Sequence, residues 1–95
     1  YGSQNEIVRA VNLALQNGFK IDEKSIANHL DSANFGDVDL LIRTGGEQRL
    51  SNFLLWQSSY AELVFTPTLW PDFTSKELEE IIAKFKSIHR KFGAI

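Results

Sequence analysis

The chain has 95 residues, 43% of them hydrophobic, and its 10 basic and 12 acidic residues give a net charge of −2. This balance argues against a nucleic-acid-binding protein, which would need clustered positive charge, and so short a chain has a small core. The absence of cysteine excludes a disulfide framework and a thiolate metal site. No apolar run approaches the length of a membrane span, and we expect a cytoplasmic protein.

The chain begins with two predicted helices. The first covers residues 5–17, where apolar side chains recur at helical spacing and Gly18 provides a stop. Its apolar face consists of Ile7, Val11, Ala14 and Leu15. Asp22 can cap a second, shorter helix, and a loop is expected over residues 31–37. The apolar face of the second helix consists of Ile26, Ala27 and Leu30.

The middle of the chain predicts two strands. Residues 38–43 form a nearly continuous apolar run, which is typical of a strand covered on both faces, as in a parallel sheet. Ser51 stands where a helix N-cap would, so we expect a short helix from there through about Gln57. A second strand is predicted over residues 62–66.

The clearest element is a final helix opened by Thr74. Thr74 and Glu77 have the spacing of a capping box, and Gly93 ends the helix. Its apolar stripe consists of Leu78, Ile81, Ile82, Phe85, Ile88 and Phe92. The order helix, helix, strand, helix, strand, helix predicts an α/β fold in which helices bridge parallel strands.

The segment between the predicted strands carries the candidate binding residues. Arg43 ends the first strand, at the edge of the sheet where open α/β proteins bind ligands. Gly45 and Gly46 allow a turn with positive φ, Arg49 returns to the same rim, and Ser51 offers a hydroxyl group. Two guanidinium groups beside a helix N-terminus predict an anion site, which suits a diphosphate better than a lone carboxylate.

Structural roles for these residues remain open at this stage. Ser51 could be only a helix cap, and the two glycines could form only a turn. The candidate ion-pair partners of the arginines are Asp39, Glu47 and Glu62.

The stretch DLLIRTGGEQRLSNFLLWQSSYAE, residues 39–62, followed by LWPDF, resembles the cis-prenyltransferases, specifically the undecaprenyl diphosphate synthase family. It joins R-T-G-G-E-x-R-x-S-N-F to W-Q, Y-A-E and L-W-P-D-F at unbroken spacing. The resemblance implies the parallel-sheet α/β fold of that family with flanking helices, not a Rossmann dinucleotide binder. It also implies that residues 1–95 are a C-terminal fragment of a single domain whose N-terminal half is absent.

The resemblance implies a prenyltransferase that uses Mg²⁺ and condenses isopentenyl diphosphate with an allylic diphosphate such as farnesyl diphosphate. The product would be undecaprenyl diphosphate, the precursor of the cell-wall lipid carrier. The family pattern assigns Arg43, Arg49, Ser51 and the backbone of Leu50 to the diphosphate of isopentenyl diphosphate, and Glu62 to Mg²⁺. It implies a homodimer, with a peripheral membrane contact for the lipid product, and no catalytic residue in this fragment, which we predict to be inactive alone.

Several other residues receive structural interpretations. The aromatic residues of the second half are interpreted as core plus dimer interface: Trp56, Tyr60, Phe65, Trp70 and Phe73. His29 and His89 do not predict a metal site, because neither has a second ligand nearby in sequence. Arg90 and Lys91 are interpreted as favourable charges in the last turn of a helix rather than as site residues.

Two other functional classes are weighed against the enzyme. A non-catalytic partner subunit would share the fold, but such subunits tend to lose the R-T-G-G-E-x-R-x-S pattern, which is intact here. A stand-alone phosphate-binding module would be a complete domain that folds well by itself.

Overall fold

The computed structural model describes residues 2–93, with side chains as far as residue 88. The chain divides into two compact units. The first contains Tyr1–Asp39 and Leu50–Ala61, and the second contains Leu40–Arg49 and Glu62–Ile95. The interpretations of His89, Arg90, Lys91 and Phe92 concern side chains that lie outside the described ones.

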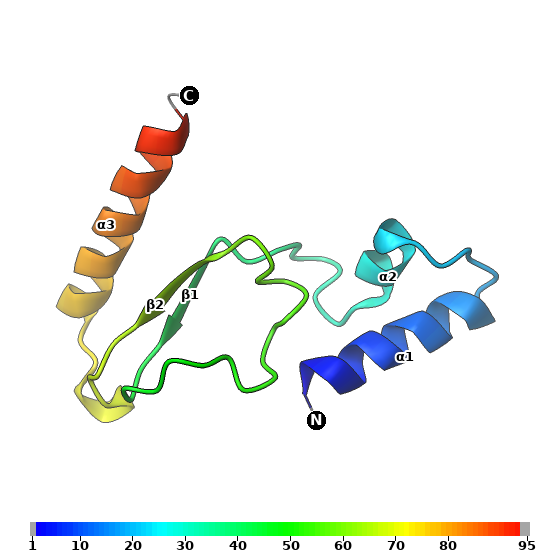
Figure 1. The fold of residues 1–95 in the computed structure, drawn as a ribbon, viewed down its shortest axis with the longest axis horizontal. Coiled ribbons are helices and arrows are strands. Elements are labelled where there is room, and N and C mark those ends of the chain that lie inside the picture. Colours follow the sequence, from blue (N-terminus) through cyan, green and yellow to red (C-terminus); the bar gives the residue numbers. More distant parts are fainter. Residues whose placement is uncertain (1, 94–95) are drawn as a thin grey trace. The chain divides into compact units, whose positions relative to one another are not determined.

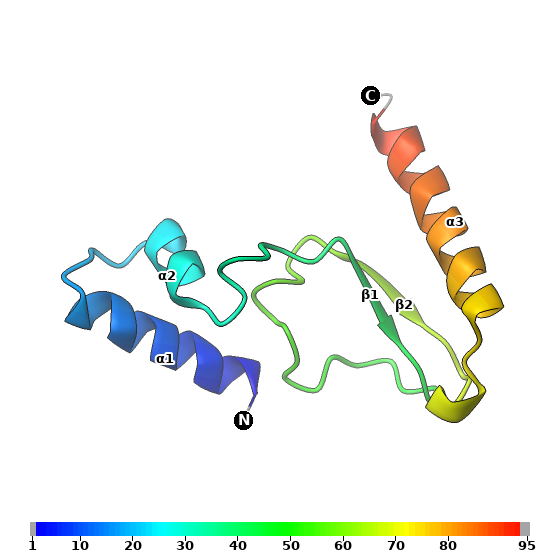
Figure 2. The same cartoon turned by 180° about the vertical axis from the view of Figure 1, so that it is seen from behind.

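In the first unit, α1 (Ser3–Gln16) and α2 (Glu23–His29) pack side by side, as both views show (Figures 1 and 2). The prediction of α1 is confirmed, including its stop: Gly18 has φ +79°, and its N–H donates to the carbonyl of Leu15. The prediction that Asp22 caps α2 is also confirmed. Its Oδ1 accepts from the Ser25 N–H at 2.8 Å, and its own N–H donates to the Ser25 hydroxyl at 3.0 Å.

The buried residues of α1 share only Ala14 with the predicted apolar residues. The buried residues are Ser3, Glu6, Ala10 and Ala14. Of the predicted apolar residues, Ala14 is buried, Ile7 and Val11 are half-buried, and Leu15 is 56% exposed. Small and polar side chains at helical spacing allow close approach of neighbouring segments, and they form the contact face of α1.

The prediction of a helix from Ser51 through about Gln57 is wrong. Residues 51–60 form consecutive turns and bends. Ser51, Asn52 and Leu54 have φ values of 50°, 63° and 49°, in the left-handed region that a right-handed helix cannot include. The connection between the two strands is therefore irregular rather than helical.

The second unit contains two parallel strands, β1 (Leu40–Arg43) and β2 (Glu62–Phe65). Their register pairs Leu40 with Glu62 and Arg43 with Phe65. Both strands were predicted, and their parallel pairing confirms the α/β class. All four residues of β1 are half-buried within the described residues.

A short 3₁₀ helix, η1 (Trp70–Asp72), precedes α3 (Ser75–Gly93). The cap at Thr74 is confirmed in part: its hydroxyl accepts from the Glu77 N–H at 3.2 Å. The Glu77 carboxylate instead accepts hydrogen bonds from the hydroxyls of Thr66 and Thr68. The described apolar stripe of α3 is half-buried at Ile81, Ile82, Phe85 and Ile88, and Leu78 is exposed.

The aromatic residues predicted to form core plus dimer interface are only partly buried. Tyr60 is 98% exposed and Trp70 is also exposed, so neither belongs to the core of the described residues, and their place at a dimer interface stays a prediction. Trp56, Phe65 and Phe73 are half-buried. Trp70 stacks on Phe73 with ring centroids 6.0 Å apart. Within the described residues, no helix combines the length and apolar character that crossing a membrane requires.

Candidate functional site

The turn after β1 is built on the two glycines. Gly45 and Gly46 have φ values of 94° and 85°, as the sequence predicted. Their N–H groups donate to the carbonyls of Thr68 at 2.9 Å and Thr66 at 3.0 Å. These amides therefore hold the turn against the segment that follows β2. The carbonyl of Arg43 also accepts from the Thr66 N–H at 2.9 Å, which continues the strand pairing.

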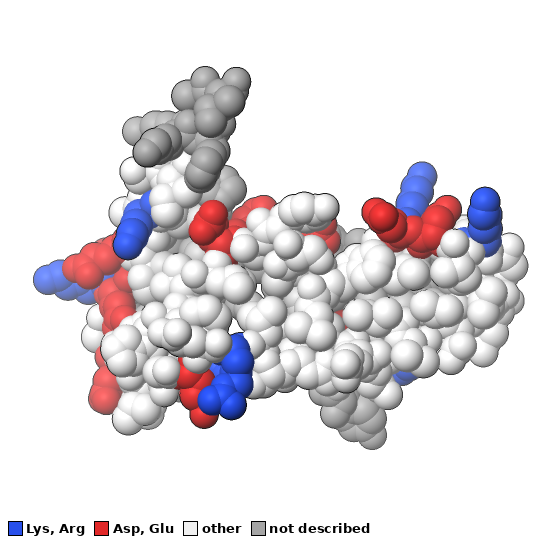
Figure 3. Space-filling view, viewed as in Figure 1, with Lys and Arg blue, Asp and Glu red and all other residues white. Residues whose placement is uncertain are grey.

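Arg43, Glu47 and Arg49 form a charged cluster on this turn. Nη2 of Arg43 lies 2.6 Å from Oε2 of Glu47, and Nη1 of Arg43 donates to the carbonyl of Arg49. Nε of Arg49 lies 4.0 Å from the same Glu47 oxygen. In Figure 3, basic and acidic atoms lie side by side below the two strands, at the edge that holds this turn. The alternative that the arginines pair with a nearby carboxylate is therefore confirmed for Glu47, which pairs with both of them.

The cluster nevertheless retains the features of an anion site. Two guanidinium groups surround one carboxylate, so it carries a net positive charge. The Arg43 side chain is 29% exposed and is oriented by Glu47 and the Arg49 carbonyl, whereas Arg49 is 69% exposed. A guanidinium fork held by neighbouring groups loses less side-chain freedom when it binds an oxyanion.

Leu50 and Ser51 belong to the first unit, whereas Arg43 and Arg49 belong to the second. Leu50 is half-buried and its carbonyl accepts from the Phe53 N–H at 3.1 Å, while Ser51 is exposed. Because no helix begins at Ser51, the expected contribution of a helix N-terminus to the anion site falls away. Ser51 can still offer its hydroxyl, from a turn in which its own φ is left-handed.

Glu62 opens β2 and lines a hollow of about 300 Å³ beside α3. The other lining residues are Leu40, Leu63, Val64, Ile81, Lys84, Phe85 and Ile88. Among the described residues, no group of three or more His, Cys, Asp or Glu side chains could hold a metal ion. A single carboxylate still fits Mg²⁺, which keeps several waters and takes few protein oxygens. Glu62 thus fits as one ligand of a site completed by other groups.

The chain was compared with models of known protein families, with curated proteins and with solved structures. The family model described as "Putative undecaprenyl diphosphate synthase" matches residues 1–93. The chain belongs to this family.

Two curated relatives of this family member are isoprenyl transferases. That of Wolinella succinogenes is 56% identical over 95 residues, which are 100% of this chain and 42% of that protein. That of Helicobacter pylori is 56% identical over 101 residues, covering 100% of this chain and 43% of that protein. The chain therefore spans less than half the length of these curated relatives.

Solved structures agree on the fold. A probable undecaprenyl diphosphate synthase from Campylobacter jejuni superposes with a TM-score of 0.85 at 43% identity, over 90% of this chain and 40% of that one. Lavandulyl diphosphate synthase from Lavandula x intermedia, in complex with dimethylallyl diphosphate, gives a TM-score of 0.75 at 40% identity, with the same coverage. These similarities confirm both the predicted family and the α/β fold class.

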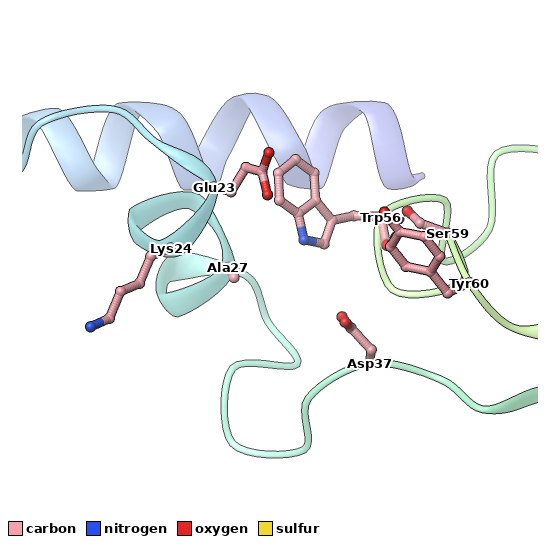
Figure 4. Close-up of a pocket in the computed structure, with 7 residues that line it drawn as sticks. All are labelled: Glu23, Lys24, Ala27, Asp37, Trp56, Ser59 and Tyr60. Atoms are coloured by element: carbon pink, nitrogen blue, oxygen red, sulfur yellow. Dashed lines mark hydrogen bonds between the residues drawn. The ribbon is translucent and has the colours of Figure 1, made fainter. Parts of the chain in front are cut away.

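A second hollow, of about 660 Å³, lies within the first unit. Figure 4 shows its lining, with Trp56 and Tyr60 beside Glu23 and Asp37, and with Lys24 pointing away from the indole. Two carboxylates against one ammonium group make this lining acidic, which disfavours a diphosphate. The hollow contains none of the predicted substrate-binding residues of the family member.

A polar network around Glu6 of α1 was not predicted from the sequence. Glu6 is buried, and its carboxylate accepts from the Asp31 N–H at 3.0 Å and from Nε2 of Gln57 at 3.3 Å. The spacing of Ser3 and Glu6, three residues apart on one helix face, was the available signal. A hydrogen bond from Arg9 to Asp31 also joins α1 to the segment after α2, and it raises the pKa of the Arg9 guanidinium.

Proposed function

We propose that this chain supplies the isopentenyl diphosphate site of a cis-prenyltransferase. The whole enzyme condenses isopentenyl diphosphate with an allylic diphosphate such as farnesyl diphosphate, and it makes undecaprenyl diphosphate, the precursor of the cell-wall lipid carrier. The observation that carries the proposal is the pair of guanidinium groups around Glu47 at the carboxyl end of β1, in a chain of this family.

Arg43 and Arg49 bind the diphosphate of isopentenyl diphosphate in this proposal. A diphosphate carries more charge than the Glu47 carboxylate and offers several oxygens to two guanidinium forks, so it competes effectively for both arginines. Ser51 adds its hydroxyl and Leu50 its backbone. Holding the diphosphate in this way fixes the acceptor alkene relative to the allylic substrate, and such orientation lowers the barrier of a two-substrate reaction.

Glu62 is proposed as one ligand of Mg²⁺. The carboxylate is a hard oxygen donor of the kind that Mg²⁺ prefers, and it is half-buried at the start of β2. When bound, the metal neutralises developing charge on the leaving diphosphate.

Three further features of the whole enzyme are proposed with this function. The chain is the C-terminal fragment of one domain and is inactive alone, which the 42% coverage of a relative supports. The enzyme is a homodimer with an interface in this region, consistent with the exposed aromatic rings of Tyr60 and Trp70. It works in the cytoplasm, with a peripheral membrane contact for its lipid product.

The test is steady-state kinetics and calorimetric titration of isopentenyl diphosphate with the full-length enzyme and its Arg43→Ala and Arg49→Ala variants. Losing one charge-assisted contact is expected to cost about 2–4 kcal/mol, or about 30- to 1000-fold in affinity. Arg9→Ala is the matched control, because Arg9 is also an exposed, ion-paired arginine but lies on α1. Unchanged binding in both folded site variants would overturn the proposal. Retained binding without turnover in the full-length enzyme would favour a non-catalytic subunit.

A further inference from the structure

We propose that Asn52 is a positioning residue, which holds Ser51 in its binding conformation by clamping the N-terminus of α1. The inference rests on the proposed function, because it gives Ser51 its role toward the diphosphate. Every residue in the argument belongs to the first unit of the chain.

The first observation is how the start of α1 is capped. The opening N–H groups of a helix have no partner within the helix. The N-cap residue Gly2 has no side chain to offer, but Asn52 supplies two acceptors from a distant part of the sequence. Its carbonyl accepts from the Ser3 N–H at 2.7 Å, and its Oδ1 accepts from the Gln4 N–H at 2.8 Å. Asn52 thus caps α1 from the turn that carries Ser51.

The same contact is reciprocated by α1. The buried Ser3 hydroxyl accepts from the Leu55 N–H at 2.9 Å, so helix and turn each satisfy backbone groups of the other. A β-carbon at Gly2 would overlap Nδ2 of Asn52, which shows how closely the amide lies against the helix start. Asn52 and the start of α1 are therefore closely packed, and the turn and the helix hydrogen-bond to each other.

The second observation is the backbone of the turn. Ser51, Asn52 and Leu54 all have left-handed φ values, and three such non-glycine residues within four positions are unfavourable for an isolated segment. The conformation persists only where surrounding contacts fix it. The Asn52 clamp lies one residue after Ser51, so it fixes the backbone that carries the Ser51 hydroxyl.

The other end of the turn is also anchored. Gln57 is 1% exposed, and its Nε2 donates to the Ser32 hydroxyl at 2.9 Å and toward the Glu6 carboxylate. Its carbonyl accepts from the Val38 N–H at 2.8 Å. With Gln57 fixed, release of Asn52 would free only the end of the turn that carries Ser51. Loss of the clamp should therefore affect substrate binding more than folding.

The test uses Asn52→Gly in the full-length enzyme, because glycine keeps the left-handed conformation accessible and removes only the side-chain acceptor. We expect the KM for isopentenyl diphosphate to rise about tenfold, roughly one lost neutral hydrogen bond, while the KM for the allylic diphosphate stays unchanged. Gly2→Ala should have the same effect, since its methyl group displaces the Asn52 amide while Asn52 and Ser51 stay intact. Asn34→Ala, at an exposed asparagine of the loop after α2, is the matched control.

A double-mutant cycle with Ser51→Ala decides whether Asn52 acts through Ser51. If it does, Asn52→Gly has no further effect on the KM in the Ser51→Ala background. An equal rise in both backgrounds, or an unchanged KM in Asn52→Gly, overturns the inference while leaving the proposed function standing. If Ser51→Ala, Arg43→Ala and Arg49→Ala all leave the KM unchanged, the proposed function fails and the inference falls with it.

Discussion

Arg43 and Glu62 lie at opposite ends of the two-stranded sheet, because Arg43 pairs with Phe65 and Glu62 pairs with Leu40 in parallel register. At a rise of about 3.3 Å per residue, the three intervening steps separate them by about 10 Å along the strands. The Arg43 guanidinium is also held on the turn beyond the carboxyl end, by Glu47 and the Arg49 carbonyl. Within one copy of the chain, the proposed diphosphate contact and the proposed metal ligand are therefore separate.

This separation predicts independent effects of the two residues. Glu62→Gln should raise the Mg²⁺ concentration needed for half-maximal activity and leave isopentenyl diphosphate affinity without metal unchanged. Arg43→Ala should weaken that affinity and leave the Mg²⁺ requirement unchanged. In the double variant, the two losses of transition-state stabilisation should add within about 0.5 kcal/mol, as for distant sites.

The measurement is kcat/KM of the four enzymes over a Mg²⁺ titration. Glu79→Gln, at an exposed position of α3, controls for the loss of one negative charge. A coupling of more than about 1 kcal/mol would place both residues in one site and contradict the separation.

The glycine turn gives a second prediction. Gly45 has φ +94°, and a β-carbon at this position would meet no atom within 4 Å, so Gly45→Ala introduces backbone strain without a collision. The left-handed conformation should cost about 1–2 kcal/mol of stability. Because the same turn orients Arg43 and Arg49, the KM for isopentenyl diphosphate should also rise severalfold.

Gly18→Ala is the matched control for this strain. Gly18 has φ +79°, also with open space around it, but it ends α1 in the first unit. We expect Gly18→Ala to lower the free energy of unfolding by a similar amount while leaving the KM unchanged. Equal KM values in the two variants would mean that the geometry of the turn after β1 does not matter for binding. Chemical denaturation and initial rates on the same preparations give both quantities.

The sequence predicted the helix cap and the turns correctly where residues close in sequence supply each other's hydrogen bonds or where glycine permits a left-handed φ. Asp22 caps α2 through Ser25, three residues away, and Gly18 ends α1 by its left-handed φ. Gly45 and Gly46 turn the chain for the same reason. In each case the decisive interaction is short-range, so the order of residues alone predicts it.

Long-range contacts explain the failures. The segment after Ser51 has the cap and apolar residues of a helix, but its polar groups bond to α1, 48 positions away between Asn52 and Gln4. That tertiary contact overrides helix propensity. Likewise, periodicity located α1 and the burial of Ala14, but it did not predict that Leu15 is exposed and Glu6 is buried. Burial of a carboxylate depends on partners such as Gln57, which sequence spacing does not reveal.

The Glu77 carboxylate supports the candidate site from α3, which gives a third prediction. Its Oε2 accepts from the hydroxyls of Thr66 at 2.7 Å and Thr68 at 3.1 Å. The carbonyls of these two threonines hold the amides of Gly45 and Gly46. Glu77→Ala should therefore lower the free energy of unfolding by about 1–3 kcal/mol, because it leaves the buried Thr66 hydroxyl with a weaker set of acceptors.

The variant should also raise the KM for isopentenyl diphosphate, since a loosened Thr66–Thr68 segment no longer fixes the turn that orients Arg43. Glu77→Gln keeps a neutral amide oxygen as acceptor, so it should recover part of both losses. Glu80→Ala removes an exposed carboxylate from the same helix and should change neither quantity. A loss of stability in Glu77→Ala with an unchanged KM would show that the glycine turn keeps its geometry without this support, and that α3 contributes to folding alone.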